Sequence, residues 1–360
     1  MEHLPNKRER KTQGLSALKK MITYPKSREQ KLFLFVILVL VVSFFFSLTI
    51  GRYKLGLVGI LALIKLKLTG QPIPAYLSSD DIVFWSVRLP RLVMALMVGA
   101  ALAVSGTVFQ GLFRNPLVSP DILGVSAGAS FGAGMAILLV GESALAIQGF
   151  AFGFGLLAVT LAYQLGRRCR SDAITVLVLA GVIVSALFTA GLSFLKYVAD
   201  PYEQLPAIVF WTMGGFSTIV WKDIAMTLPV ILIGMGILFL LRWKLDILAL
   251  GDEEAMSLGV NVNKMRFLYI FSATLIVASS VSACGTIGWV GLVVPHMARL
   301  IIGPGHNQLV IFAAILGAVF MILMDTIARS ISGGEIPIGI ITSFIGAPFL
   351  AYLLWKQGEE

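Results

Sequence analysis

Residues 32–50 read LFLFVILVLVVSFFFSLTI, an apolar run without a charged side chain. A helix needs about 20 apolar residues to cross the hydrocarbon core of a bilayer, so this run is long enough to span a membrane. The whole chain of 360 residues has the same character, with 58% hydrophobic and 13% charged residues. Soluble domains carry roughly 25% charged residues. The chain is therefore predicted to be a membrane protein, which excludes a disordered segment, a disulfide scaffold and a secreted globular enzyme.

Ten such runs follow one another along the sequence, once Gly and Pro are tolerated as they are in membrane helices. We expect helices near 32–50, 91–113, 121–140, 144–166, 173–195, 223–242, 266–284, 286–302, 307–325 and 336–355. The stretch from 266 to 302 is too long for one span, and Gly285 and Gly288 offer the break. The predicted fold class is all-α, a polytopic membrane domain over 32–355 that follows a basic tail at 1–31.

The net charge of +9 is concentrated at the N-terminus, where residues 1–31 hold nine Lys and Arg against three Glu. Basic residues before a first span keep that end of the helix in the cytoplasm. Ten spans then place both termini in the cytoplasm, with 19 of the 28 Lys and Arg residues on that side. The charge therefore indicates membrane topology, with lipid headgroup contact as an addition, and not binding to nucleic acid.

A short internal repeat divides the chain into two halves. Gly106-Thr107 precedes Pro116, and Gly285-Thr286 precedes Pro295 at the same offset of 179 residues. Five spans in each half would turn the second copy upside down, and inverted five-helix halves are an architecture of transporters. Chance matches in a Gly-rich apolar chain explain so few positions equally well.

The sequence Gly-Val-Ser-Ala-Gly at 124–128 matches the GxSxG motif of serine hydrolases. That motif requires a strand, a sharp turn and a helix, with a histidine base in reach. Ser126 instead lies in an apolar segment, and His296 is the one histidine placed inside the expected membrane region. Glycines spaced four apart let membrane helices approach closely. Close packing is favoured here, and an intramembrane serine hydrolase stays a remote alternative.

Motifs for cofactor binding and for ion coupling are sparse. The sequence has no GxxxxGK[ST] loop and no HExxH motif, and Cys169 and Cys284 lack metal-site spacing. Ion-coupled carriers commonly use buried ionisable residues. The nearest candidates, Asp121 and Asp325, fall at the ends of expected spans, and Asp325 can pair with Arg329 four residues later. An ion-coupled secondary transporter is a second remote alternative, and no cofactor is expected on this chain.

Two segments are too short or too polar to span. Residues 204–216 read QLPAIVFWTMGGF, which fits either a re-entrant half-helix that lines a passage or an amphipathic loop on the outer surface. Residues 242–266 form the longest polar segment between spans, and its central part, 245–262, carries apolar side chains beside an acidic run. That pattern fits either a docking surface or an ordinary interfacial loop.

Four stretches resemble the FecCD-type permeases, the membrane subunits of prokaryotic ABC importers for iron-siderophores, haem and cobalamin. They are RLPRLVMALMVGAALAVSG (88–106), FRNPLVSPDILGVSAGA (113–129), GTIGWVGLVVPHMARL (285–300) and GEIPIGIITSFIGAPFLAYLL (334–354). WTMGGF (211–216) and LALGDEEAMSLGV (248–260) match more loosely. The resemblance covers the chain from about 88 to 355 in the order of the family.

The resemblance implies a non-enzymatic permease in the cytoplasmic membrane of a prokaryote. Its partners would be a second permease subunit in a homodimer, two cytoplasmic ATPase subunits that hold ATP and Mg, and an extracytoplasmic substrate-binding protein. The cargo would be an iron(III)-siderophore or related metal chelate, with haem or cobalamin as the alternative. Alternating access would move it, and no chemistry would occur on this chain.

The resemblance also implies roles for particular residues. Arg88 and Arg329 would dock the binding protein, although both could instead face lipid headgroups outside the membrane. The cytoplasmic gate would comprise Asn115, Leu117 and Thr175, and this chain departs from the Ser/Thr-rich pattern of the family near 173–175. The ATPase-coupling segment would use Leu250, Gly251, Asp252, Glu253, Ala255, Leu258 and Gly259. The passage would be lined by Trp211, Met213, Gly214 and Gly215.

Overall fold

A computed structural model describes residues 26–51, 53–168, 173–331 and 334–357. These residues form helices joined by turns, with no strand among them, which confirms the all-α fold class. The long helices are α2 (Lys26–Thr49), α5 (Leu89–Leu112), α6 (Val125–Leu139), α7 (Ala144–Arg168), α8 (Ala173–Val198), α10 (Trp221–Leu250), α12 (Val262–Cys284), α13 (Val290–Ile302), α14 (His306–Ala328) and α15 (Ile338–Gln357). Each expected span overlaps one of these helices.

The short helices connect or cap the long ones. They are α3 (Leu57–Leu68), η1 (Ala75–Leu77), α4 (Ser78–Asp81), η2 (Ile82–Arg88), η3 (Pro120–Leu123), α9 (Gln204–Met213) and α11 (Asp252–Ser257). Within the described ranges, seven helices are long and apolar enough to cross a membrane, namely α2, α5, α7, α8, α10, α12 and α14. The other three expected spans, α6, α13 and α15, are apolar but shorter in their continuous helical part.

Several boundaries differ from those expected. Helix α2 begins at Lys26, so the last part of the basic tail is helical, and residues 1–25 of that tail lie outside the described residues. The segment 75–88, which lies outside every expected span, forms short helices that continue into α5. The expected break within 266–302 is confirmed, because α12 ends at Cys284 and α13 begins at Val290.

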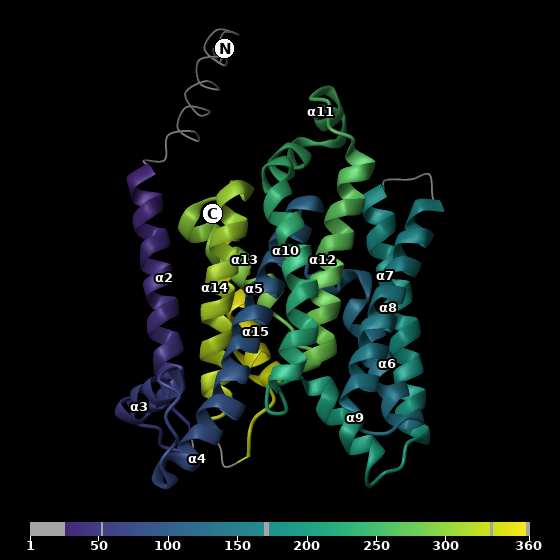
Figure 1. Ribbon diagram of the computed structural model, residues 1–360. Helices are drawn as coiled ribbons and strands as arrows, with labels where there is room; N and C mark the ends of the chain where they lie inside the picture. Colours follow the sequence, from purple (N-terminus) through teal and green to yellow (C-terminus); the bar gives the residue numbers. More distant parts are fainter. Residues whose placement is uncertain (1–25, 52, 169–172, 332–333, 358–360) are drawn as a thin grey trace, which may run out of the picture.

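Helix α5 is the central element of the bundle (Figure 1), and its side chains are buried almost throughout. It packs closely against α14, where Gly99 faces Gly317, and against α13, where Gly106 faces Gly291. A Cβ atom on Gly106 would overlap the carbonyl oxygen of Gly291. Small residues therefore let these backbones touch, as expected for helices that pack in a membrane.

The two ends of the bundle carry different short elements. Helix α11 projects from the end at which α2 begins, and α3, α4 and α9 lie at the opposite end (Figure 1). We refer to these as the α11 end and the α9 end. The two copies of the Gly-Thr repeat differ locally, because Gly106 lies inside α5 and Gly285 lies in the break after α12 with φ of 71°.

Replacing Gly106 by alanine should destabilise the protein, because the new methyl group must displace the α13 backbone. Overpacking of this kind typically costs about 1–3 kcal/mol. The matched control is Gly153→Ala in α7, where nothing lies within 4 Å of an added Cβ. Thermal unfolding in detergent measures both. A Gly106→Ala protein as stable as the Gly153→Ala protein would contradict the close contact of α5 with α13.

Candidate functional site

Three interrupted helices meet at the α9 end. Helix α9 stops at Gly214, α12 stops at Gly285, and α15 begins beside Gly339. The Gly215 N–H donates to the Cys284 carbonyl at 2.8 Å, and the Ile338 N–H donates to the Gly214 carbonyl at 3.0 Å. Backbone groups that leave regular helix need such partners inside a membrane.

Glycine is required at this junction for two reasons. Gly214 and Gly285 adopt φ of 70° and 71°, which side-chain-bearing residues rarely adopt. A Cβ on Gly285 would overlap the Trp211 carbonyl oxygen, and a Cβ on Gly339 would overlap that of Met213. The chain breaks are therefore locked together by backbone contact.

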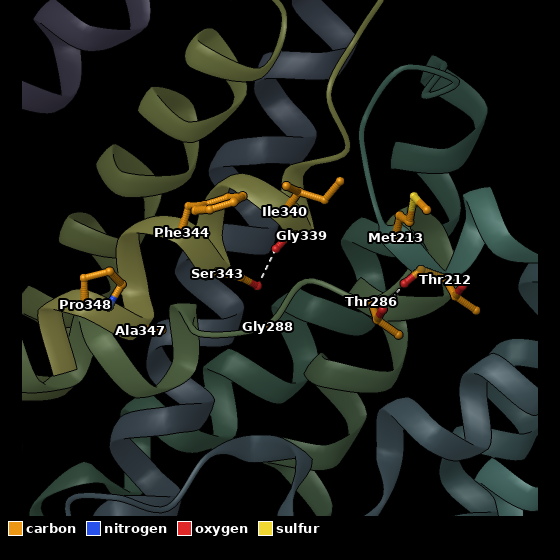
Figure 2. A pocket seen from close by; sticks show the side chains of 10 residues that line it. All are labelled: Thr212, Met213, Thr286, Gly288, Gly339, Ile340, Ser343, Phe344, Ala347 and Pro348. Atoms are coloured by element: carbon orange, nitrogen blue, oxygen red, sulfur yellow. Dashed lines mark hydrogen bonds between the residues drawn. The ribbon is translucent and has the colours of Figure 1, made fainter. Parts of the chain in front are cut away.

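A cavity of about 620 Å³ opens at this junction (Figure 2). It is lined by Thr212, Met213, Thr286, Gly288, Gly339, Ile340, Ser343, Phe344, Ala347 and Pro348, with no charged side chain among them. Its hydroxyl groups donate to backbone carbonyls, Thr286 to Thr212 at 2.5 Å and Ser343 to Gly339 at 2.7 Å. The wall therefore offers cargo apolar contact and few free donors.

The structure separates the four residues predicted to line the passage. Met213 lines this cavity, and Gly214 is buried at the junction beneath it. Trp211 and Gly215 instead line a second cavity of about 340 Å³. Residues 211 and 213 diverge because two helical steps rotate a side chain by about 200°. The sequence predicted the half-helix α9, but it did not predict which side of α9 lines which cavity.

Buried charges gather at the α9 end of α5 and α14. Asp325 is fully buried, and Arg91 Nε donates to it at 2.7 Å. Arg91 also pairs with Glu335 at 2.8 Å, and Arg329 Nε lies 3.5 Å from Asp325. The Asp325–Arg329 pair expected from the four-residue spacing is thus confirmed. The ion pairs of Arg91 with Asp325 and Glu335 were not predicted, because Arg91 is far from both acids in the sequence and no local spacing relates them.

The two arginines predicted to dock a binding protein are buried in this cluster. Arg88 is 5% exposed and donates to the carbonyls of Leu48 and Tyr53. Arg329 is 6% exposed and donates to the Ser47 carbonyl and, at 2.6 Å, to the Ser47 hydroxyl. Guanidinium groups thus cap the last turn of α2. The alternative in which both face lipid headgroups is wrong for this structure, and docking stays a prediction.

Tyr53, which follows α2, contacts both Arg88 and Asp80 of α4. Tyr53 accepts from Arg88 through its carbonyl, and its phenol donates to Asp80 at 2.5 Å. This hydrogen bond raises the pKa of Tyr53 above its ordinary value. The segment after α2 is therefore attached both to the buried cluster and to α4.

The predicted gate residues lie on exposed surface at or near helix ends. Asn115 and Leu117 occupy the turn after α5, where the Asn115 side chain accepts from the Leu117 N–H at 2.9 Å. Leu117 is exposed, and Thr175 is exposed near the start of α8. Closure of a pore by these side chains stays a prediction.

The predicted coupling residues lie in α11 and in the residues that flank it on both sides. Leu250, Met256 and Leu258 are 62%, 57% and 60% exposed, and Glu253 and Gly259 are also exposed. Ala255 and Gly251 are buried beneath them. An apolar surface that protrudes from the end of a membrane bundle is typical of a protein contact.

Asp252 joins α11 to two other elements. Arg266 of α12 donates to its carboxylate at 2.8 Å, and Arg114 lies 3.5 Å from it. Arg114 directly precedes Asn115 in the gate turn. This link between α11 and the turn after α5 was not predictable from the sequence, since 138 residues separate the two partners.

The serine hydrolase motif is used for packing. The Ser126 hydroxyl donates to Asp121. A Cβ on Gly128 or on Gly132 would overlap a backbone oxygen of α7, so these glycines seat α6 against α7. Close packing, the favoured interpretation of this motif, is confirmed at both glycines.

Comparison with known proteins identifies the family. A family model described as the FecCD transport family matches residues 39–356. The chain belongs to the FecCD transport family. It is thus an integral membrane permease of the ABC transporter type, and the expected resemblance is confirmed.

The relatives of this FecCD member align over most of this chain and over most of their own length. The molybdate import system permease protein MolB of Haemophilus influenzae is 42% identical over 89% of this chain and 94% of its own. The cobalamin import system permease protein BtuC of Halobacterium salinarum is 39% identical over 76% and 73%. A solved structure described as an inward-facing candidate metal-chelate type ABC transporter superposes with a TM-score of 0.81, 39% identity and coverage of 91% and 99%.

Removing the charge of Asp325 should destabilise this FecCD permease strongly, because Arg91 and Arg329 would keep buried charges without their shared carboxylate. Breaking a buried ion pair typically costs about 3–5 kcal/mol. We expect Asp325→Asn to lower the unfolding temperature in detergent far more than Glu142→Gln, a change of an exposed acid in the turn before α7. Equal unfolding temperatures would show that the cluster does not stabilise the fold.

Proposed function

We propose that this chain moves a metal chelate, in the first place an iron(III)-siderophore, through an ABC importer. The observation that carries the proposal is the charge-free cavity of about 620 Å³ where three broken helices meet in a FecCD member. A large chelate needs room and weak contacts, since a tight polar site would hold it in place. Haem or cobalamin would suit such a wall in the same way.

The complete importer would contain further subunits. A second copy of this chain would enclose the passage, and two ATPase subunits holding ATP and Mg would bind the exposed apolar side chains of α11. An extracytoplasmic binding protein would dock at the α9 end. The α11 end would then face the cytoplasm, in agreement with the Lys and Arg distribution.

Docking through Arg88 and Arg329 would require an exchange of acceptors. Both guanidinium groups bind neutral backbone carbonyls of α2 and the following turn. A carboxylate on the binding protein is a stronger acceptor, because charge-assisted hydrogen bonds are roughly twice as strong as neutral ones. Docking would therefore release the end of α2 from these arginines.

Motion would pass from the ATPase subunits to the gate through Asp252. Its contacts with Arg266 and Arg114 connect α11 to α12 and to the turn that carries Asn115 and Leu117. Closure of the ATPase subunits would shift α11 and, through Arg114, the gate turn. Leu117 would then block the passage by its bulk and by excluding water.

A second cargo is favoured by one relative. MolB is named for molybdate, an oxyanion, and is 42% identical to this chain. The cavity wall has neither a cation to hold an oxyanion nor an acid to repel it. The wall therefore accepts either cargo, and selection would fall to the binding protein.

Cellular uptake tests the proposed function. In the native strain lacking this chain, the wild-type chain should restore uptake of ⁵⁵Fe bound to the strain's own siderophore. Met256→Glu/Leu258→Glu should return uptake to the level of the deletion strain, because charged side chains would oppose apolar docking of the ATPase subunits. Lys31→Glu/Lys356→Glu, a control that places two acidic side chains at exposed positions of α2 and α15, away from α11 and from the α9 end, should leave uptake intact.

The other outcomes are equally informative. Restored uptake of ⁹⁹Mo-molybdate without restored iron uptake would make the oxyanion the cargo. Restored uptake that is unaffected by Met256→Glu/Leu258→Glu would refute the coupling role of α11. Uptake of neither tracer, with the chain present in the membrane, would refute both cargo proposals.

A further inference from the structure

A third cavity lies at the α11 end and is separate from the passage. It has a volume of about 600 Å³ and lies between α7, α8 and α12. Three cationic side chains line it, namely Arg167 of α7 and Lys264 and Arg266 of α12, and no acidic side chain of the described residues does. A basic cavity between membrane helices near the aqueous boundary has the electrostatics of an anion site.

Arg266 carries the most specific sign of a ligand. Its side chain lines the cavity and the residue is 8% exposed, so its guanidinium group has little access to bulk water. One terminal nitrogen donates to both carboxylate oxygens of Asp252, at 2.8 and 3.1 Å. Its Nε is buried and has no hydrogen-bond partner among the described residues. Buried donors almost always have a partner, so the free Nε of this cavity-lining residue indicates an acceptor that the described residues do not supply.

The other two cations are available to the same acceptor. Arg167 and Lys264 are exposed, and no described carboxylate forms an ion pair with either. Three positive charges thus line one cavity, and among these three cations only Arg266 forms an ion pair with a described carboxylate, that of Asp252. A phosphate group matches them, since arginine and lysine both bind phosphate through charge-assisted hydrogen bonds.

Aromatic side chains in the same cavity favour a phospholipid over a phosphate compound without an acyl chain. Tyr163 and Phe267 line the cavity, with ring centroids 5.7 Å apart, and Phe267 is exposed. These rings lie on helices that span the membrane, next to the cationic groups. A ligand with a phosphate and an acyl chain satisfies both surfaces, whereas inorganic phosphate satisfies only the cations.

We propose that the cavity between α7, α8 and α12 binds the phosphate headgroup of an anionic phospholipid. Arg266 Nε would donate to the phosphate while the terminal nitrogen stays on Asp252, and Arg167 and Lys264 would pair with the remaining oxygens. The lipid would steady the arginine that holds α11, and so the proposed coupling helix. The binding itself is independent of the cargo and of the proposed function.

Titration of the purified full-length chain in detergent tests the proposal. The probes are a short-chain phosphatidylglycerol, the matching short-chain phosphatidylcholine and inorganic phosphate. The test variant is Arg167→Gln/Lys264→Gln, and the control is Lys31→Gln/Lys356→Gln, which removes two exposed lysines from α2 and α15. Calorimetry measures the affinity, and unchanged thermal unfolding curves confirm that all three proteins remain folded.

We expect the wild-type chain and the control to bind phosphatidylglycerol with equal affinity and more tightly than phosphatidylcholine. The test variant should bind it roughly tenfold or more weakly, since each basic side chain near an anionic headgroup contributes about a factor of five. Equal phosphatidylglycerol affinity in test and control variants would overturn the site. Binding of inorganic phosphate as tight as that of the lipid would overturn the choice of a phospholipid.

Discussion

The exchange of backbone hydrogen bonds at Gly214, Gly285 and Gly339 is the constraint on which the proposed passage depends. A helix that stops inside a membrane exposes N–H and C=O groups that lipid cannot satisfy. Here α9 and α12 end and α15 begins at one place, where the Gly215 N–H donates to the Cys284 carbonyl and the Gly214 carbonyl accepts from the Ile338 N–H. Irregular backbone can therefore line a cavity with backbone partners and hydroxyl groups alone, since charged side chains are absent from the residues that line it.

The contacts that stabilise the bundle and the contacts proposed to transmit motion lie in different parts of the molecule. Glycine contacts along α5 and the buried charges around Asp325 hold the α9 end of the bundle together. At the α11 end, the contacts of Asp252 with Arg114 and Arg266 are partly exposed and link separate elements. Partly exposed ion pairs contribute little to stability. They suit the proposed connection, which would transmit motion from separate ATPase subunits.

The sequence predicted the helices well and the contacts between distant helices poorly. Charge-free runs located each span, and the glycines at 285 and 288 located the break between α12 and α13. The burial of Arg88 and Arg329 was not predictable, because it depends on the end of α2, which lies about 40 residues from one and 280 from the other. The link from Asp252 to Arg114 was hidden for the same reason. Local periodicity predicts which face of a helix is apolar, but it does not predict which other helix packs against that face.

The central claim is that cargo crosses this chain by alternating access driven by ATP from outside the chain. Transport into proteoliposomes that contain the chain with its ATPase and binding-protein partners measures this most directly. We expect accumulation of cargo only when ATP is supplied on the side of α11 and can be hydrolysed, with no accumulation from a proton or sodium gradient alone. Gradient-driven accumulation by the chain without the ATPase subunits would contradict the account and establish an ion-coupled carrier.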